Sequence, residues 1–366
     1  MSGGIDSTCC VALLKEQGYT VIGVTIINWS DGDNIPPYAS EAQRVAVKMG
    51  IEHHIVDART EFRTRIIEPF IDSYINGFTP NPCIECNPEF KFRTLLEFAD
   101  SIGCSTIATG HYASTVRYRD TVAIAPAKDK TKDQSYFLWK LGQDTLERTV
   151  FPLADYTKQE IREYARKEGL EEKNQEKESM EICFIRDDYR SFIKEQVPDI
   201  DKRIGAGDFV NKEGQKIGRH KGYPFYTIGQ RKGLEVAFGA PRYVIKLNPK
   251  ANTVMLGLED DLKTEYMQME HPSFITSVED IQEGIRNRHI SIKIRYRSKA
   301  VICRDLVEIK DNLWIVRFEE PVQAVTPGQY AVFYSNADNL PIIGGAKIAS
   351  QRGIAQYINT LKDQVL

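Results

Sequence analysis

The feature that most constrains the fold is a glycine-rich turn at the start of the chain, Ser2-Gly3-Gly4-Ile5-Asp6-Ser7. Adjacent glycines allow backbone torsions that turn successive N–H groups inward toward an anion. Val11, Leu13 and Leu14 begin an apolar pattern that predicts a helix ending near Gly18. Unpaired amides and the helix dipole both favour negative charge at a helix start. The turn therefore predicts a phosphate site, although an isolated Ser-Gly-Gly is also typical of an ordinary helix N-terminus.

Strand and helix patterns alternate over the first 110 residues. The β-branched run 21–27 predicts a buried parallel strand, and two shorter strands are predicted at His53–Val56 and Thr106–Ala108. The intervening helices are predicted over 38–49, 60–76 and 90–102. This order predicts an α/β fold with a doubly wound parallel sheet and a site beyond the carboxyl ends of its strands. In that topology a strand precedes the phosphate loop, so we expect translation to start about ten residues upstream of Met1, enough for one strand.

A proline-rich stretch, Thr79–Pro88, contains the pair Cys83 and Cys86. Its three prolines and two asparagines predict a loop without regular structure. Cys-x-x-Cys is typical of half a zinc site or of a redox pair. Neither reading is favoured here, because no second ligand pair follows and prolines flank both cysteines; we predict no resident metal site. Cys183, taken alone, is typical of a buried core thiol.

The predicted secondary structure changes from mostly helices to short strands in the second half of the chain. Residues 130–195 are predicted to be mostly helical, with helices at Asp133–Leu141 and Thr157–Gly169, and with Thr157 and Glu160 as a capping box. From Ile204 onward, glycines punctuate short alternating segments, which predicts two small β domains. The clearest strand is Ile290–Arg297. We predict domains at 1–200, 201–265 and 266–366.

Charge is distributed unevenly. The net charge is −3, yet residues 202–250 hold eleven Lys and Arg against three acidic residues. Residues 285–304 hold seven Lys and Arg and no acidic residue. Such segments suit a phosphate backbone, although a solvated charged surface is the alternative. Neither an apolar run of membrane-spanning length nor a secretion signal is present, so we expect a cytoplasmic protein without a membrane partner. In that reducing compartment, seven cysteines are expected to be thiols rather than a disulfide framework.

Several short motifs together carry a specific resemblance. The opening turn resembles the SGGxDS loop of the PP-loop ATP pyrophosphatases. The motifs that follow it occur in the order found in the tRNA-specific 2-thiouridylases, the MnmA/TrmU family. They are NPCIECN, ATGHYA (108–113), KDQSYFL (132–138), SMEICFI (179–185), GQRKGL (229–234), KIRYR (293–297) and TPGQYAVFY (326–334). This family implies a PP-loop ATP-binding domain with a helical tRNA-binding part at about 130–200, then a small central β domain and a β-barrel-like tRNA-binding domain.

The resemblance implies a tRNA-uridine 2-sulfurtransferase. ATP adenylates the C2 oxygen of wobble uridine 34, and a persulfide sulfur then displaces AMP to give 2-thiouridine. ATP is the implied cofactor, with Mg²⁺ bound transiently beside it, and Asp6 either helps to organise the metal or caps the helix. The implied nucleotide-binding residues are Ser2, Gly3, Gly4, Asp6, Ser7, Ile26 and Gly110.

The resemblance also assigns the thiols. Cys183 corresponds to the persulfide carrier, and Cys86 to the nucleophile that releases the sulfur and ends in a Cys86–Cys183 disulfide. Cys83 stands where many members carry an aspartate, proposed as acid/base for the uridine. Either Cys83 has a different role, or water or Glu85 moves the proton. The other four cysteines (9, 10, 104 and 303) are predicted to be core.

The implied partners are tRNAs of the Lys, Glu and Gln type and a persulfide donor, either a cysteine desulfurase or a relay protein. We expect a monomer. The implied tRNA-contacting residues are Asn81, Pro82, Cys83, His111, Lys132, Asp133, Gln134, Arg295, Tyr296 and Gln329. Two alternatives stay open at this point: another PP-loop tRNA-modifying enzyme, or a non-catalytic tRNA-binding protein with a degenerate nucleotide site.

Overall fold

The structure is a computed structural model. It describes residues 1–30, 32, 34–170, 182–234, 240–310, 312–336, 341–351, 353–354 and 357–358. The chain divides into two compact units. The first consists mainly of Met1–Glu68 and Pro82–Phe184, and the second mainly of Pro69–Asn81 and Ile185–Asn336.

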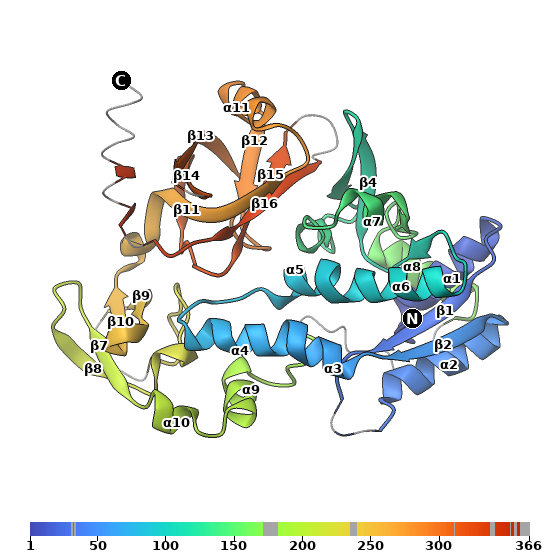
Figure 1. Cartoon of the computed structure of the whole chain (residues 1–366), viewed down its shortest axis with the longest axis horizontal. Coiled ribbons are helices and arrows are strands. Elements are labelled where there is room, and N and C mark those ends of the chain that lie inside the picture. Colours follow the sequence, from blue (N-terminus) through green and yellow to red (C-terminus); the bar gives the residue numbers. More distant parts are fainter. Residues whose placement is uncertain are drawn as a thin grey trace. The chain divides into compact units, whose positions relative to one another are not determined.

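Parallel strand pairs organise the first unit. β1 (Ile22–Ile27) and β2 (Glu52–Asp57) pair in parallel, and α2 (Pro37–Met49) connects them. β3 (Ile107–Ala108) and β6 (Thr149–Val150) form a second parallel pair. Figure 1 shows β1 and β2 side by side with α2 beside them. The predicted α/β class with parallel strands is confirmed.

The helices of the first 170 residues include all those predicted except the one at Asp133–Leu141. They are α1 (Ile5–Glu16), α2, α3 (Arg59–Phe62), α4 (Glu68–Ile75), α5 (Pro82–Cys86), α6 (Arg93–Ser101), α7 (Gln143–Glu147) and α8 (Lys158–Lys167). π-helical segments at Arg63–Ile67 and Asn87–Phe92 join α3 to α4 and α5 to α6. The capping box of Thr157 and Glu160 at the start of α8 is confirmed.

The prediction that Thr79–Pro88 lacks regular structure is wrong for its second half. Pro82 begins α5, and the helical path continues through the π segment into α6 without a break (Figure 1). A proline is tolerated in the first turn of a helix, because the amide that it lacks has no partner there anyway. Pro88 falls in the first turn of the π segment, whose wider turn accommodates it.

The predicted helix at Asp133–Leu141 is also wrong. Only Ser135–Phe137 forms a 3₁₀ turn there. Asp133 Oδ1 accepts hydrogen bonds from the amides of Ala127 and Ser135, both at 3.2 Å. A short polar side chain that binds nearby amides competes with the helix backbone for them. An unpredicted hairpin, β4 (Ala113–Tyr118) and β5 (Thr121–Pro126), precedes this turn.

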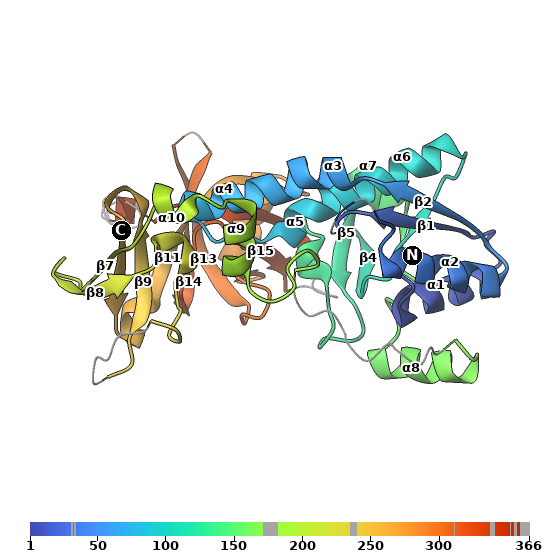
Figure 2. The same ribbon diagram turned by 90° about the horizontal axis from the view of Figure 1, so that it is seen from below.

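The second unit carries the two predicted β regions. A four-stranded sheet in the order β8-β7-β10-β9 is followed in the chain by a closed barrel in the order β11-β14-β13-β12-β15-β16. Figure 2 labels β7, β8 and β9 of the sheet and β11, β13, β14 and β15 of the barrel. The sheet strands are β7 (Gly207–Val210), β8 (Lys216–His220), β9 (Tyr243–Asn248) and β10 (Thr253–Gly257). The barrel strands are β11 (Lys263–Phe274), β12 (Ile290–Lys293), β13 (Val301–Lys310), β14 (Leu313–Gln323), β15 (Tyr330–Ser335) and β16 (Ile342–Ile348). The remaining helices are α9 (Tyr189–Gln196), α10 (Ile200–Arg203) and α11 (Val278–Arg286).

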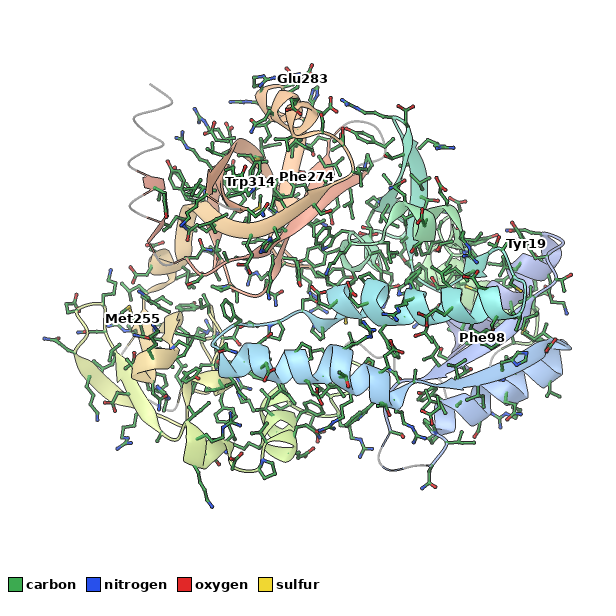
Figure 3. The ribbon with its side chains drawn as sticks, in the orientation of Figure 1. Tyr19, Phe98, Met255, Phe274, Glu283 and Trp314 are labelled. Carbon is green, nitrogen blue, oxygen red and sulfur yellow. The ribbon has the colours of Figure 1, made fainter. Side chains whose placement is uncertain are left out.

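The strand predicted at Ile290–Arg297 is shorter than expected. β12 ends at Lys293, because Arg295 and Ser298 close a turn in which the Ser298 amide donates to the Arg295 carbonyl oxygen at 3.0 Å. Trp314 and Phe274, labelled in Figure 3, lie on β14 and β11 of the barrel, and the Phe274 ring meets Phe333 edge-on at 5.3 Å. Among the described helices, none combines the length and apolar character needed to cross a membrane.

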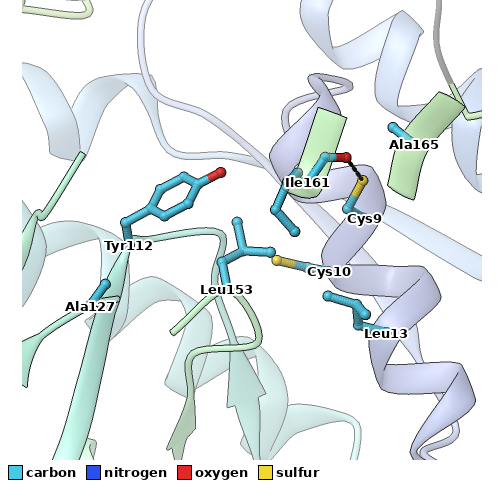
Figure 4. Close-up of a cluster of buried hydrophobic side chains, with 8 residues drawn as sticks. All are labelled: Cys9, Cys10, Leu13, Tyr112, Ala127, Leu153, Ile161 and Ala165. Carbon is cyan, nitrogen blue, oxygen red and sulfur yellow. Dashed lines mark hydrogen bonds between the residues drawn. The ribbon is translucent and has the colours of Figure 1, made fainter. Parts of the chain in front are cut away.

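The core of the first unit fixes the start of α1. A buried cluster packs α1 against α8 and the segment around Tyr112 (Figure 4). Its members are Cys9, Cys10, Leu13, Tyr112, Ala127, Leu153, Ile161 and Ala165. The Cys9 thiol lies 3.8 Å from the Ile161 carbonyl oxygen. Because α1 is held along this face, the turn that precedes it has a fixed position in the unit.

Candidate nucleotide and thiol site

The glycine turn leads directly into α1, as predicted. Gly3 has φ +74°, and a Cβ there would lie 2.6 Å from Glu41 Cγ, so this position requires glycine. Gly4 is the N-cap of α1, and its carbonyl oxygen accepts from Ser7 Oγ at 2.9 Å. The Ser2 amide donates to Ser7 Oγ at 3.3 Å. The turn is thus held by its own hydroxyls at the positive end of a twelve-residue helix.

Asp6 is paired with a lysine that lies far away in the sequence. Lys158 Nζ donates to both Asp6 carboxylate oxygens at 2.8 Å, and Tyr112 Oη donates to Oδ1 at 3.0 Å. In the described residues, no group of three or more His, Cys, Asp or Glu side chains is placed to hold a metal ion. Asp6 therefore neutralises Lys158 and does not fit a resident magnesium site.

Gly110 lies against the same turn. A Cβ at Gly110 would stand 3.5 Å from the Asp6 carbonyl carbon and the Ser7 nitrogen, which is ordinary contact. Ile26, near the carboxyl end of β1, has its carbonyl oxygen bound by Tyr38 Oη at 3.3 Å. The structure therefore brings Gly110 onto the phosphate turn and places Ile26 at the strand end, where nucleotides bind in such sheets.

Cys83 and Cys86 lie three residues apart on α5. Burial raises the pKa of the Cys83 thiol to about 11 and that of Cys86 to about 12. The Lys91 ammonium opposes both shifts, and the Lys91 amide donates a hydrogen bond to Cys86 that also lowers its pKa. Lys91 is thus the cation that favours thiolate formation at this helix.

Cys183 lies against the residue that follows β1. Asn28 Nδ2, just beyond β1, lies 3.6 Å from Cys183 Sγ. The next residue, Phe184, packs on Phe62 at 5.7 Å, and Phe62 packs on Phe90 at 5.0 Å. Desolvation raises the pKa of Cys183, whereas Lys91 and the Asn28 amide lower it. Residues 179–181 of the SMEICFI motif lie outside the described residues.

The charges of Cys183 and Lys91 act on both thiols of the cysteine helix. Ionised Cys183 raises the pKa of both Cys83 and Cys86, and Lys91 lowers the pKa of all three. Glu85, an alternative proton carrier, is instead held by Lys140, with 2.6 Å between Oε2 and Nζ. Of the cysteines predicted to be core, Cys9, Cys10 and Cys303 are buried and Cys104 is half-buried.

Three of the predicted tRNA-contacting residues in the first unit are anchored within the protein. Burial and the nearby Lys91 hold the pKa of His111 well below its usual value, and its ring stacks on Phe92 at 5.9 Å. Asp133 is buried. Gln134 Oε1 accepts from the Tyr112 amide at 3.0 Å. His111 is therefore neutral at pH 7, and each of these residues has a local structural partner.

Gln329 and Arg295, predicted in the second unit, also bind backbone. Gln329 Nε2 donates to the carbonyl oxygens of Thr79 at 2.9 Å and Pro80 at 3.2 Å. The adjacent Gly328, at φ +92°, would place a Cβ 2.9 Å from Phe78 Cβ. Arg295 donates to the Gln323 carbonyl oxygen at 3.2 Å. The TPGQ motif therefore clamps the segment that leads toward α5.

A basic pocket of about 820 Å³ lies in the second unit. It is lined by cations from α9 and from 221–232, together with aromatic rings. These residues include Arg190, Lys194, Lys221, Phe225, Tyr226, Arg231 and Lys232. Arg190 is partly neutralised by Asp188 at 2.7 Å, whereas the side chains of Arg231 and Lys232 are exposed. The GQRKGL motif thus supplies cations to a concave surface.

Sequence reasoning gave no site role to Lys158, Lys91 or Asn28. Lys158 lies 152 positions from Asp6, so no local pattern links them. Asn28 lies 155 positions from Cys183. Lys91 had a signal, since it follows Cys86 by five residues on a continuous helical path. An ammonium near two cysteines favours their thiolates.

Comparison with known proteins decides the family. Residues 1–187 match the model described as a tRNA methyl transferase HUP domain, 190–258 a tRNA methyl transferase PRC-barrel domain, and 264–348 an aminomethyltransferase beta-barrel domain. The tRNA-specific 2-thiouridylase MnmA 3 of Bacteroides fragilis is 49% identical over 99% of this chain and 96% of its own length. The chain belongs to the tRNA-specific 2-thiouridylase MnmA family.

Two further relatives agree. MnmA 3 of Phocaeicola vulgatus is 50% identical over 100% of this chain and 97% of its own length. MnmA of Cytophaga hutchinsonii is 40% identical over 96% of each chain. The resemblance found from the motif order is therefore confirmed, and so is the predicted sequence of one α/β domain followed by two β domains.

Proposed function

We propose that this chain is a tRNA-uridine 2-sulfurtransferase, which uses ATP to replace the C2 oxygen of wobble uridine 34 by sulfur. The observation that carries the proposal is that one unit holds both Cys183, which lies against Asn28 just beyond β1, and the helix of Cys83 and Cys86. The phosphate turn before α1 belongs to the same unit. Relatives of nearly full length are named for tRNA-specific 2-thiouridylation.

The nucleotide would bind at the glycine turn. Amides at the start of α1 would bind phosphate oxygens, and Gly110 leaves room beside the turn. ATP use follows from membership of the family. Mg²⁺ would arrive with ATP and reduce the charge on its phosphates, since Asp6 is already paired with Lys158. The protein's own contribution is a preformed turn and a neutralised carboxylate.

The chemistry divides between activation and displacement. Adenylation of the uridine C2 oxygen releases pyrophosphate and makes AMP the leaving group. The terminal sulfur of a Cys183 persulfide then attacks C2, and AMP departs. The Cys86 thiolate attacks the remaining Cys183 sulfur, the old S–S bond breaks, and its electron pair goes to the sulfur on C2. The products are 2-thiouridine and a Cys86–Cys183 disulfide.

The substrate tRNA would be held largely by charge. Arg231, Lys232 and Lys221 line a pocket whose aromatic walls suit a sugar-phosphate backbone. The wobble base must leave its stack to reach the thiols. The preference for tRNAs of the Lys, Glu and Gln type, the identity of the persulfide donor, the cytoplasmic location and the monomeric state stay predictions.

The test is nucleoside mass spectrometry of tRNA from a thiolase-deficient strain that carries each variant. Cys86→Ser and Cys183→Ser are each expected to abolish 2-thiouridine while tRNA binding is retained. Cys104→Ser, a half-buried thiol from the same unit, is the matched control and is expected to retain the modification. A wild-type level of 2-thiouridine in either of the first two variants would refute the proposal. Another thiolated base in the profile would favour a different PP-loop tRNA-modifying enzyme.

A further inference from the structure

The position of Cys83 gives it a different chemistry from the carboxylate that it replaces. Cys83 and Cys86 are three residues apart on α5. Helix geometry sets the Cα atoms of such a pair about 5 Å apart on one face. This spacing falls within the range that a disulfide spans, about 4.4 to 6.8 Å. The helix therefore presents two thiols whose Cα separation suits a disulfide.

The third thiol, Cys183, belongs to the same unit as Cys83 and Cys86. Cys183 lies against Asn28, and Phe184 is joined to the cysteine helix through Phe62 and Phe90. The unit thus holds a third thiol, Cys83, in addition to the two that the sulfur-transfer step needs. Glu85, which lies between the two cysteines in the sequence, binds Lys140.

We propose that Cys83 is a resolving thiol, which transfers the oxidation from the Cys86–Cys183 pair to the Cys83–Cys86 pair. The inference rests on the proposed function. The Cys83 sulfur attacks Cys86, the Cys86–Cys183 bond breaks, and its electron pair leaves on Cys183 together with the proton that Cys83 gives up. A Cys83–Cys86 disulfide and a free Cys183 thiol result. An external protein dithiol then reduces the helical disulfide, while Cys183 is already free to accept the next persulfide.

The surroundings suit this order of events. Burial raises the pKa of the Cys83 thiol to about 11 and that of the Cys86 thiol to about 12, so both are mainly protonated before the disulfide forms. Once the disulfide is formed, the attacking sulfur is held next to its target, and this proximity offsets a small thiolate fraction. Lys91 lies near all three sulfurs and stabilises whichever one is negative.

The decisive experiment is disulfide mapping of the full-length protein after one turnover. The protein is loaded with persulfide, given ATP and tRNA without reductant, quenched in acid and alkylated. Peptide mass spectrometry is expected to find a Cys83–Cys86 disulfide and an alkylated Cys183. A Cys86–Cys183 disulfide with alkylated Cys83 as the final species would overturn the proposal. In Cys104→Ser, the control, the pattern is expected to be unchanged.

A second arm separates this inference from the proposed function. Cys183→Ser has no persulfide carrier, yet an oxidised small dithiol is expected to convert its Cys83 and Cys86 into a disulfide. Failure to form that disulfide in a protein with a wild-type circular dichroism spectrum refutes the resolving role, even if 2-thiouridine forms normally. Conversely, the wild type could make no 2-thiouridine while Cys183→Ser still forms the Cys83–Cys86 disulfide. That result would refute the proposed function but not the ability of Cys83 and Cys86 to form a disulfide.

A third arm measures turnover with two reductants. With a protein dithiol, Cys83→Ser is expected to make 2-thiouridine at least about tenfold more slowly than wild type over repeated turnovers. A small dithiol at high concentration is expected to restore most of the rate, because it reaches Cys86–Cys183 directly. Equal rates for Cys83→Ser and wild type with the protein dithiol would contradict the inference.

Discussion

The phosphate turn and the cysteine helix lie in one unit but control charge in opposite ways. At the turn, Lys158 donates hydrogen bonds to both carboxylate oxygens of Asp6. At the helix, burial holds Cys83 and Cys86 as neutral thiols, and only Lys91 opposes it. The first arrangement neutralises the Asp6 carboxylate, so the turn can accept an anionic ligand. The second keeps the Cys83 and Cys86 sulfurs as unreactive thiols until a proton is removed.

The largest expected effect comes from removing the lysine that neutralises Asp6 at the phosphate turn. Lys158→Met leaves the Asp6 carboxylate unpaired beside the phosphate turn, so we expect kcat/KM for ATP to fall about 100-fold. Asp6→Asn combined with Lys158→Met should recover part of this loss, because the stray charge is gone. The control is Lys128→Met, which removes an exposed pair with Glu160 and should change little. Steady-state kinetics with varied ATP decides, and an unchanged kcat/KM in Lys158→Met would contradict the account.

The next effect tests the dormant thiols. Because the pKa of Cys86 is raised to about 12, its thiolate fraction grows about tenfold for each pH unit from 7 to 9, and the single-turnover sulfur-transfer rate should follow it. Lys91→Met removes the opposing charge and should lower the rate about tenfold throughout this range. Lys91→Arg keeps the charge and should retain most of the rate. A rate that does not vary with pH, or equal rates in Lys91→Met and wild type, would refute this role.

A moderate effect is expected where the second unit clamps the segment before α5. In Gly328→Ala, the new Cβ would meet Phe78 and Thr79 at a backbone φ of +92°, so we expect the free energy of unfolding to fall by about 2 kcal/mol. Gly142→Ala is the matched control, since nothing lies within 4 Å of its Cβ position and its φ is −73°. It should cost less than about 1 kcal/mol. Urea unfolding of both variants measures the difference, and equal losses would argue against the clamp.

The smallest effect is expected at the basic pocket. Arg231→Ala and Lys232→Ala should each weaken tRNA binding about threefold and reduce the slope of log Kd against log salt by about one. Lys250→Ala, an exposed lysine of the same unit outside the pocket lining, is the control. Binding titrations at several salt concentrations give both quantities. A salt slope that stays the same in both pocket variants would remove the pocket from the tRNA surface.

The two regions also differ in how much the sequence predicts. The phosphate turn and α1 follow from local rules, because adjacent glycines and an apolar spacing are contiguous in the chain. The cysteine helix does not, since Pro82 and Pro88 suggest a loop unless each is known to fall in the first turn of a helical segment. The pairs Asp6–Lys158 and Asn28–Cys183 join residues more than 150 positions apart, so only the folded chain reveals them. The resemblance to a family supplied the roles of Cys86 and Cys183, whereas the residues alone favoured neither zinc nor redox chemistry for the Cys83–Cys86 pair.

The most direct measurement follows the sulfur itself. Cys183 of the purified full-length protein is loaded with a ³⁴S-labelled persulfide, and excess donor is removed. ATP and an unmodified substrate tRNA are then added for a single turnover. Mass spectrometry of the tRNA nucleosides is predicted to find ³⁴S in 2-thiouridine at position 34, in an amount equal to the label lost from Cys183. Label that stays on Cys183, or 2-thiouridine that contains no ³⁴S, would contradict the account.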